Sequence, residues 1–388
     1  MDTIYQIIIP ALLAFLGTLW VHPKVLKIAV NKNLVDNPDA RKLQRRPVPN
    51  MGGSAVFFGI VIGLCSSNAI FSSPNSFMIV AAMLIMLYTG IMDDIIGLTP
   101  RLRFIIEILI VCWIMYVNKA SISCFYGFWG IGVMPAWVSY PLTILSCVGI
   151  INAINLIDGV NGLSSGFCFM ASVFFAIMFH ELGNTLMMAF AVVAAGAIVP
   201  FFLHNVFGHD SKMFIGDSGT LVFGTMMSMF VISILNGNLP CMVLMHRGIG
   251  LLPFTLAVLS IPVFDTIRVM STRILHKRSP FSPDKTHLHH IFIDLGFSHT
   301  GTTIIILTLN LIIIAAWMLA YQLGASIDVQ FYVVVVMGVL FTFVLYNFSK
   351  RQIEKNGRML HLLQRLGKSM NFEKKGVWST IERLIDKL

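Results

Sequence analysis

Long apolar runs alternate with short polar segments along nearly the whole chain. A helix needs roughly 20 predominantly apolar residues to cross the hydrocarbon core of a bilayer, and eleven runs approach this length. The runs lie near residues 4–21, 52–70, 77–92, 103–118, 136–154, 163–179, 185–203, 218–236, 248–267, 301–321 and 329–348. The pattern predicts an all-α, polytopic integral membrane protein with about 11 transmembrane helices.

The basic residues are divided very unevenly between the two sides that these spans define. When the loops are assigned to alternate sides, 25 of the 27 Lys and Arg residues fall on one side, and only Lys119 and Arg247 fall on the other. The positive-inside rule then places the N-terminus outside and the C-terminus in the cytoplasm. Because no Lys or Arg precedes the first run, we expect it to be retained as a helix and not removed as a signal peptide. The formal charge of +9 therefore reflects topology, and we expect no nucleic-acid partner.

The composition excludes several classes of protein. Hydrophobic residues make up 56% of the 388 residues and charged residues only 12%, against about 25% charged in an ordinary soluble domain. Soluble enzymes, disordered proteins and secreted disulfide scaffolds are therefore excluded. The six cysteines form no CxxC pair and mostly lie in apolar runs, so we expect small buried side chains there and not a metal or redox site.

Two parts of the chain differ in character. Residues 1–348 form the predicted membrane domain, and residues 349–388 form a basic cytoplasmic tail. Within the tail, the apolar residues of Gly376–Leu388 recur at helical spacing against charged ones. This pattern predicts a short amphipathic helix on the anionic inner leaflet, and a solvated tail without function is the alternative.

Polar residues able to do chemistry gather in four predicted cytoplasmic segments. The first is Thr89–Gly97, at the end of the third run, where Asp93 and Asp94 are adjacent. Two neighbouring carboxylates at a membrane boundary repel each other, and a divalent cation or a basic partner would relieve that repulsion. The alternative is that the pair merely marks the end of the span.

The second segment, Asn152–Leu163, carries amides and one acid. Asn152, Asn155 and Asp158 recur every three residues, close to one helical face, and the glycines that follow allow a turn or a close approach to a ligand. These side chains suit a nucleoside or a metal-bound phosphate. A glycine-rich turn with polar caps is the alternative.

The third segment, Phe214–Thr220, opens the eighth run. Free N–H groups and the positive end of the helix dipole favour anions at a helix N-terminus. Asp217 lies there next to glycine, where it could hold magnesium against a phosphate or could act as an N-cap.

The fourth segment, Ser279–His290, supplies His287, His289 and His290. Beside Lys285, these histidines favour a clamp for phosphate oxygens. A zinc site is the alternative, but the segment contains no cysteine and the nearby hard acids suit magnesium better.

Together these segments resemble the polyprenyl-phosphate N-acetylhexosamine-1-phosphate transferases, in the WecA/TagO-like branch of glycosyltransferase family 4. The resemblance covers roughly residues 1–300, with the motifs in the order of the family and all on the predicted cytoplasmic side. The matching segments are Pro47–Gly53, Asp93 with Asp94, Asn155–Gly159, Phe214–Asp217 and His287–His290.

The resemblance implies an undecaprenyl-phosphate N-acetylglucosaminyl-1-phosphate transferase. Polyprenyl phosphate would attack the sugar-linked phosphorus of a UDP-N-acetylhexosamine, most simply UDP-GlcNAc, and UMP would leave. The product would be undecaprenyl-pyrophosphoryl-GlcNAc, the first lipid-linked intermediate of cell-surface polysaccharide synthesis. The family further implies Mg2+ (or Mn2+), a multi-pass location in the bacterial inner membrane with the active site facing the cytoplasm, and we expect a homodimer.

The resemblance also implies a role for each candidate residue. The implied catalytic residues are Asp93, Asp94, Asp158, His287, His289 and His290. The implied metal ligand is Asp217, and the implied substrate-binding residues are Arg46, Asn152, Asn155, Gly159, Asn161, Asn205 and Lys285. Asn161 departs from the pattern because many relatives carry a second Asp there, which puts in doubt any mechanism that needs a charge at this position. Which of the two adjacent aspartates acts as a base stays open.

A secondary transporter of a phosphorylated solute is the main alternative from another class. Discontinuous helices and inverted repeats around the bilayer midplane would support it. Here the polar residues cluster in loops on one face and no internal repeat is visible. A non-catalytic assembly subunit explains none of the four segments.

Overall fold

The computed structural model describes residues 2–36, 47–280, 285–356, 358–372 and 376–387. Within these ranges the chain is mainly helical, with one two-stranded antiparallel sheet of β1 (Val35–Asp36) and β2 (Val48–Pro49). The helices of the first half are α1 (Asp2–Asn31), α2 (Gly52–Cys65), α3 (Asn68–Phe71), α4 (Asn75–Ile96), α5 (Pro100–Asn118), η1 (Phe128–Gly130), α6 (Ala136–Leu156), α7 (Leu163–Glu181) and α8 (Thr185–Phe207). Those of the second half are α9 (Gly216–Ile234), α10 (Leu239–His246), α11 (Leu251–Val258), α12 (Ser260–Leu275), α13 (Leu288–Asp294), α14 (His299–Gln322), α15 (Ile327–Val339), η2 (Leu340–Val344), α16 (Leu345–Glu354), α17 (Arg358–Ser369) and α18 (Gly376–Ile385).

Every predicted apolar run is mainly helical, so the all-α polytopic architecture is confirmed. Among the described residues, eight helices are long and apolar enough to cross a membrane: α1, α4, α6, α7, α8, α9, α14 and the continuous segment α15–α16. α10 and α11 form a ninth candidate, bent by 97°. α2 has only 14 residues, and α5 carries Arg101, Arg103 and Glu107. The count of eleven spans therefore stays a prediction.

Several helix boundaries differ from those of the apolar runs. α1 continues to Asn31 and α12 to Leu275, well past the last apolar stretch of each run. Hydropathy marks only the part of a helix that would lie in lipid, so it misses polar turns that extend beyond it. The structure also contains α10, which the pattern did not predict, and a bend after it where Gly248 has a φ of 84°.

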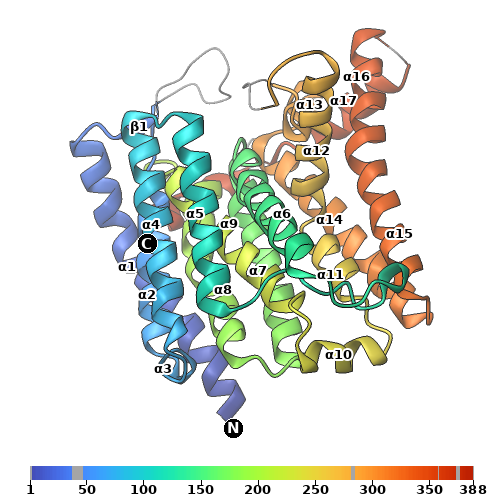
Figure 1. Ribbon diagram of the computed structural model, residues 1–388. Coiled ribbons are helices and arrows are strands. Elements are labelled where there is room, and N and C mark those ends of the chain that lie inside the picture. Colours follow the sequence, from blue (N-terminus) through green and yellow to red (C-terminus); the bar gives the residue numbers. More distant parts are fainter. Residues whose placement is uncertain (1, 37–46, 281–284, 357, 373–375, 388) are drawn as a thin grey trace.

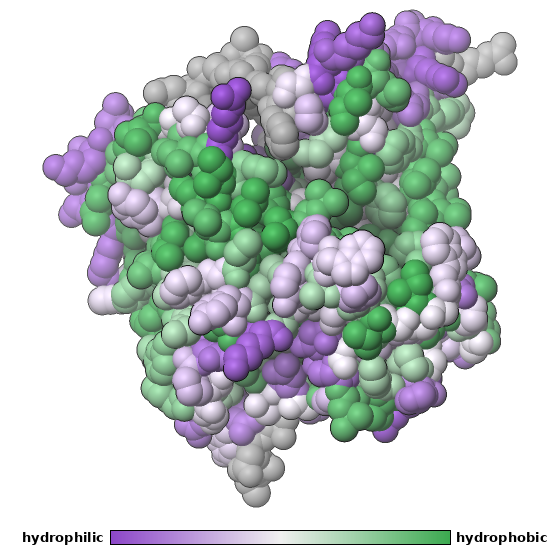
Figure 2. Space-filling model, in the orientation of Figure 1, coloured by the Kyte–Doolittle hydropathy of each residue, from purple (hydrophilic) through white to green (hydrophobic). Residues whose placement is uncertain are grey.

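The two ends of the bundle carry different elements (Figure 1). The N-terminus, α3 and α10 lie at one end, and β1, α13 and α16 lie at the opposite end. Figure 2 shows a broad apolar band across the molecule, with hydrophilic side chains at the end that carries α13 and others nearer the opposite end. This distribution is that of a multi-pass membrane protein, because an apolar belt faces lipid and polar ends face water.

α9 lies in the centre of the bundle and carries Asp217 in its first turn. Of the 18 most apolar consecutive residues of α9, 89% are buried inside the protein. The helix packs against α2, α4, α6, α7 and α8. Two glycines allow this close packing: a Cβ atom at Gly53 would overlap Gly219, and one at Gly90 would overlap Ser218. The core thereby fixes the position of Asp217 relative to α2 and α4.

The tail is helical, and α18 confirms the predicted amphipathic segment as a helix. α17 and the residues after it contact the membrane domain, where Ser298 Oγ donates a hydrogen bond to the Met370 carbonyl at 3.1 Å. α18 packs against α8. The tail therefore lies against protein at two places, and its predicted contact with the inner leaflet stays a prediction.

Candidate active site

A cavity of about 1120 Å3 lies at the end of the bundle that carries the β1–β2 sheet and α13. Its wall includes many of the residues that the sequence singled out, and these come from segments far apart in the chain. They are Asp94, Asn155, Asp158, Gly159, Asn161, Asn205, Asp217, His287, His289 and His290. The fold thus brings all four predicted segments to one place.

Three other described candidates do not line this wall. Asp93 and Asn152 belong to a polar network beside the cavity, described below, and Lys285 is not among the lining residues. Arg46 lies outside the described residues. The structure places most of the candidates together, but the roles implied for all of them stay predictions.

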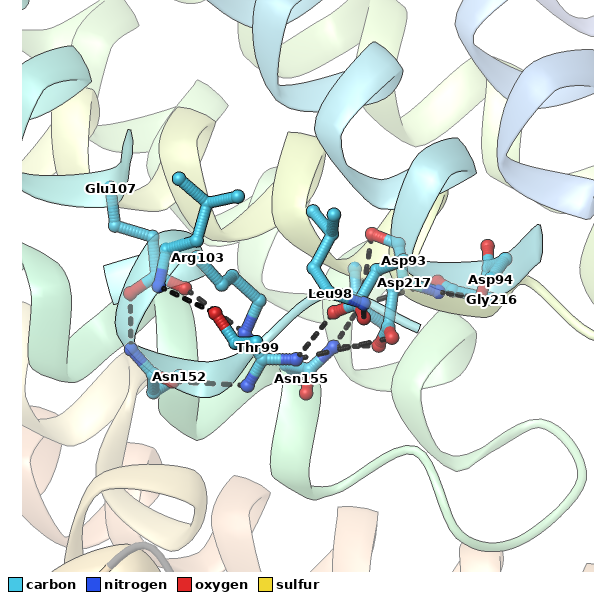
Figure 3. A network of polar contacts seen from close by, with 12 residues as sticks. Asp93, Asp94, Leu98, Thr99, Arg103, Glu107, Asn152, Asn155, Gly216 and Asp217 are labelled. Carbon is cyan, nitrogen blue, oxygen red and sulfur yellow. Dashed lines mark hydrogen bonds and ion pairs between the residues drawn. The ribbon is translucent and has the colours of Figure 1, made fainter. Parts of the chain in front are cut away.

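Asp94 joins the end of α4 to the first turn of α9 (Figure 3). Its Oδ1 accepts a hydrogen bond from the Asp217 N–H at 3.0 Å, and its Oδ2 accepts one from the Ser218 N–H at 3.1 Å. Asn50 Nδ2 also donates to Oδ1, at 2.8 Å. Asp94 therefore satisfies N–H groups that have no partner within α9. The alternative that Asp217 is the N-cap is wrong, because α9 begins after Ile215 and is capped from another helix.

The Asp217 carboxylate has partners of its own. Asn155 Nδ2 donates to Asp217 Oδ1, and the same amide donates to Thr220 Oγ1 at 2.8 Å. Arg103 Nη1 lies 3.9 Å from Asp217 Oδ2. The Asp217 side chain still keeps 32% of its surface accessible on the cavity wall, so it can meet a ligand.

Arg103 provides positive charge among the carboxylates (Figure 3). Its Nη1 lies 3.0 Å from Asp93 Oδ2, and its Nε lies 3.5 Å from Glu107 Oε1, one helical turn further along α5. Asn152 Nδ2 donates to Glu107 Oε2 at 2.5 Å. Arg103 is therefore the basic partner of Asp93, and it lies close to Asp217 as well.

Asp158 lies at the turn between α6 and α7 and accepts a hydrogen bond from Ser164 Oγ. Its carboxylate reaches the cavity, but the surrounding protein removes enough hydration to raise its pKa to about 6, against the lowering effect of Ser164. Gly159 follows directly, and a Cβ atom there would overlap the ring of His289. The glycine therefore brings the second and fourth segments into contact.

His287 is held by a buried acid that the sequence analysis did not identify. Its Nδ1 lies 3.0 Å from Asp265 Oδ2, which also accepts the Leu288 N–H at 3.2 Å. Arg268 Nη2 lies 2.7 Å from Asp265 Oδ1, and its guanidinium lies 3.7 Å above the ring centroid of Tyr346. A carboxylate at Nδ1 fixes the orientation of an imidazole and leaves Nε2 for a ligand.

His289 and His290 continue this part of the wall. The ring centroids of His287 and His289 are 5.8 Å apart and nearly parallel, and those of His289 and His290 are 4.3 Å apart. Burial, together with the neighbouring histidines, holds the pKa of His289 well below its usual range. The imidazole of His289 therefore favours its neutral form, and its part in the phosphate clamp stays a prediction.

Two of the predicted binding residues are held through backbone contacts. Asn205 Oδ1 accepts the Gly162 N–H at 2.6 Å, and its Nδ2 donates to the Met213 carbonyl at 2.8 Å. Thr303 Oγ1 donates to the Asn161 carbonyl at 2.8 Å. These contacts connect the turn after α6 to the loop after α8 and to α14, so both residues organise the wall.

The carboxylates on this wall suit a hard divalent cation. Magnesium usually binds one or two protein carboxylates together with water and substrate phosphates. Asp217 and Asp94 supply such oxygens, whereas no three His, Cys, Asp or Glu side chains form a complete ligand set in the part of the chain that the structure describes. The donors therefore fit magnesium shared with a phosphate better than a closed zinc site.

Comparison with known proteins identifies relatives with one activity. Residues 76–235 match the model of glycosyl transferase family 4. The chain is 30% identical over 317 residues to the probable undecaprenyl-phosphate N-acetylglucosaminyl 1-phosphate transferase of Bacillus subtilis (strain 168), which covers 80% of this chain and 84% of the relative. The chain belongs to glycosyl transferase family 4. The predicted family is confirmed.

Two further relatives of this family are named undecaprenyl-phosphate alpha-N-acetylglucosaminyl 1-phosphate transferase. The protein of Salmonella typhi is 28% identical over 353 residues, and that of Escherichia coli (strain K12) is 26% identical over 350 residues. Each match covers 87% of this chain and 89% of the relative. The transporter alternative finds no support among these relatives.

Sequence reasoning missed two parts of this family member's site. The first is Arg103: its spacing from Glu107 indicates only a pair within one helix, although Arg103 also reaches Asp93 and Asp217. Asp265 was not singled out at all. An acid inside the apolar run 248–267 was an available signal, because an ionisable residue in such a run needs a partner or a function.

Proposed function

We propose that this protein transfers N-acetylglucosamine 1-phosphate from UDP-GlcNAc to undecaprenyl phosphate, releasing UMP and forming undecaprenyl-pyrophosphoryl-GlcNAc. The observation that carries the proposal is that carboxylates and histidines from four separate segments line one cavity at an end of the helical bundle. The names of the relatives support the choice of lipid and sugar. The product would begin the lipid-linked synthesis of a cell-surface polysaccharide.

The reaction exchanges one phosphoanhydride bond for another. An oxygen of undecaprenyl phosphate forms a bond to the phosphorus that carries the sugar, and the bond from that phosphorus to the bridging oxygen breaks. The electron pair of the broken bond leaves with UMP. No ATP is needed, and the barrier arises mainly from bringing an anion to a negatively charged pyrophosphate.

The residues of the cavity would lower this barrier in different ways. Asp217 would be the principal ligand of Mg2+ (or Mn2+), which when bound supplies positive charge to the pyrophosphate oxygens. Arg103 allows the carboxylates of Asp93 and Asp217 to lie close together by offsetting their repulsion. His287, oriented by Asp265, presents Nε2 to a phosphate or sugar oxygen.

We place the cavity on the cytoplasmic side of a bacterial inner membrane, with the N-terminus outside. The support is the distribution of basic residues, of which 25 of 27 fall on the side that carries the four segments. The polar lining suits a water-soluble UDP-sugar that enters from this side. A homodimer stays an expectation from the family.

The test is turnover by the purified protein in detergent. Undecaprenyl phosphate and magnesium are supplied with UDP-GlcNAc or UDP-GalNAc in turn, and both UMP release and the lipid product are measured by mass spectrometry. We expect product with UDP-GlcNAc, loss of activity with EDTA, and recovery with magnesium or manganese. Absence of product with both UDP-sugars, from protein that is folded, would contradict the proposal.

A further inference from the structure

The C-terminal helix α18 contributes side chains to the wall of the cavity. Trp378 and Glu382 both line it, although they lie more than 80 residues after the histidines in the sequence. The helix packs against α8, and the ring centroids of Phe207 and Trp378 are 4.9 Å apart. The tail is therefore part of the site in space.

Asp386, directly after α18, fastens the helix to the loop between α8 and α9. Its Oδ1 accepts the N–H groups of His209 and Ser211, each at 3.1 Å, and the Ser211 hydroxyl at 2.6 Å. Its Oδ2 accepts the Asp210 N–H at 3.3 Å. Three consecutive backbone donors converging on one carboxylate form an anion-binding nest. These contacts hold the pKa of Asp386 below its usual range, although partial burial opposes them.

The same loop is also held from the bundle. Ser211 Oγ lies 2.9 Å from His204 Nδ1, and the Ser211 carbonyl lies 2.9 Å from His22 Nε2. The two histidine rings are stacked, with centroids 4.2 Å apart. The loop that runs from Asn205 to Asp217 is thus fixed on one side by the bundle and on the other by Asp386. Its position affects both of those cavity residues.

α18 forms a wall of the cavity and does not plug it. With the helix in place, the cavity still has a volume of about 1120 Å3, and Asp217 and His289 remain on its surface. The helix also follows the last candidate span, which ends at Glu354, so it belongs to the aqueous side of the protein. A soluble sugar nucleotide arrives from that side, whereas the hydrocarbon chain of a lipid phosphate stays in the membrane.

We propose that α18 forms part of the binding site for the sugar nucleotide, and that Asp386 is the positioning residue that holds α18 in this place. The inference rests on the proposed function. Asp386 touches no substrate and acts through the loop and through the position of Trp378. It should therefore affect the binding of the sugar nucleotide more than the chemical step.

The first test compares Asp386→Ala with Glu354→Ala, which also removes a carboxylate from the tail but one that is exposed. In Asp386→Ala we expect KM for UDP-GlcNAc to rise about tenfold, with kcat and KM for undecaprenyl phosphate within about twofold of wild type. Glu354→Ala should match wild type in all three. An unchanged KM for UDP-GlcNAc, or a rise only in KM for the lipid, overturns the inference. Wild-type protein without any turnover would instead overturn the proposed function.

A second test restores the contact covalently and covers the case in which Asp386→Ala is poorly folded. Ser211→Cys and Asp386→Cys are combined in a chain whose exposed Cys65 and Cys112 are replaced by Ser, and the pair is bridged by a short bis-methanethiosulfonate linker. The bridged protein should have KM for UDP-GlcNAc near that of wild type. Cleavage of the linker with dithiothreitol should raise it again. A bridged protein that is inactive until cleavage would show that α18 must leave, and the inference would be wrong.

Discussion

Replacing Asp94 with Ala should loosen the first turn of α9. The change removes the acceptor of the Asp217 N–H (3.0 Å) and of the Ser218 N–H (3.1 Å), and it leaves Asn50 Nδ2 without this partner. Because Asp217 lies in that turn, the substitution displaces the proposed principal metal ligand and also removes the Asp94 oxygens from the cavity wall. Both stability and activity should therefore fall.

The expected loss in the free energy of unfolding follows from the two backbone contacts of Asp94. Loss of a helix cap costs about 1 kcal/mol in typical cases and up to about 2, and a hydrogen bond to a charged group contributes about 1.5–3 kcal/mol. Two N–H donors share the Asp94 carboxylate, so we expect the free energy of unfolding to fall by about 2–4 kcal/mol. Asp94→Asn keeps one acceptor oxygen and the side-chain size, and it should recover roughly half of this loss.

The assay is denaturant unfolding in detergent, with turnover measured on the same samples. Wild type, Asp94→Asn and Asp94→Ala should rank in that order of stability. Asp294→Ala is the matched control, because it removes an exposed carboxylate at the end of α13 and should unfold like wild type. An Asp94→Ala protein that unfolds at the wild-type midpoint would refute the reasoning.

Three further predictions concern single residues and topology. Asp217→Asn keeps an acceptor for Asn155 but removes the negative charge. Turnover should therefore fall by about 100-fold or more, while the free energy of unfolding changes by less than about 1 kcal/mol. Full activity of this variant would refute the role of Asp217 as a metal ligand. Desolvation by the surrounding protein raises the pKa of folded Asp158 from 3.8 to about 6, so the unfolded chain loses this proton first and stability falls as pH rises between these values. Unfolding at several pH values should show this slope in wild type and its loss in Asp158→Asn. In a chain without its native cysteines, an impermeant thiol reagent applied to intact cells should label Lys119→Cys and not Lys285→Cys, and the reverse result would overturn the orientation.

Hydropathy sufficed to predict the helices because a span must be apolar whichever neighbours it packs against. The pattern could not reveal the bend after α10, since Gly248 lies among apolar residues and its positive φ leaves no periodic signal. It also underestimated α1 and α12, which continue beyond the predicted runs through turns that contain charged residues. The sequence therefore predicted which segments are helical, but not where the helices end or bend.

The candidate site was predictable as a set of segments but not as a set of contacts. Asp93, Asp94 and Asp217 stood out because charge is costly near lipid. Their partners could not be read from the sequence, because Arg103 and the first turn of α9 meet them only in the folded bundle. Nothing in the chain places Asp265 beside His287 in advance, since the two are 22 residues apart.

The tail shows a different limit of prediction from the sequence. An amphipathic pattern indicates that one face of a helix is covered, but lipid and protein cover such a face equally well. The sequence therefore predicted α18 without indicating that it packs on α8 and reaches the cavity. Asp386 carries no local signal, because its backbone partners belong to a loop about 175 residues earlier.

The reverse reaction tests the central claim most directly. Detergent-solubilised protein is given undecaprenyl-pyrophosphoryl-GlcNAc, magnesium and excess UMP, and the formation of UDP-GlcNAc is followed. Because one phosphoanhydride replaces another and a single transition state serves both directions, we expect UDP-GlcNAc to form and to disappear with EDTA. A transporter has no second compartment in detergent and could not produce this signal. Failure to form UDP-GlcNAc under conditions in which the protein is folded would contradict the account.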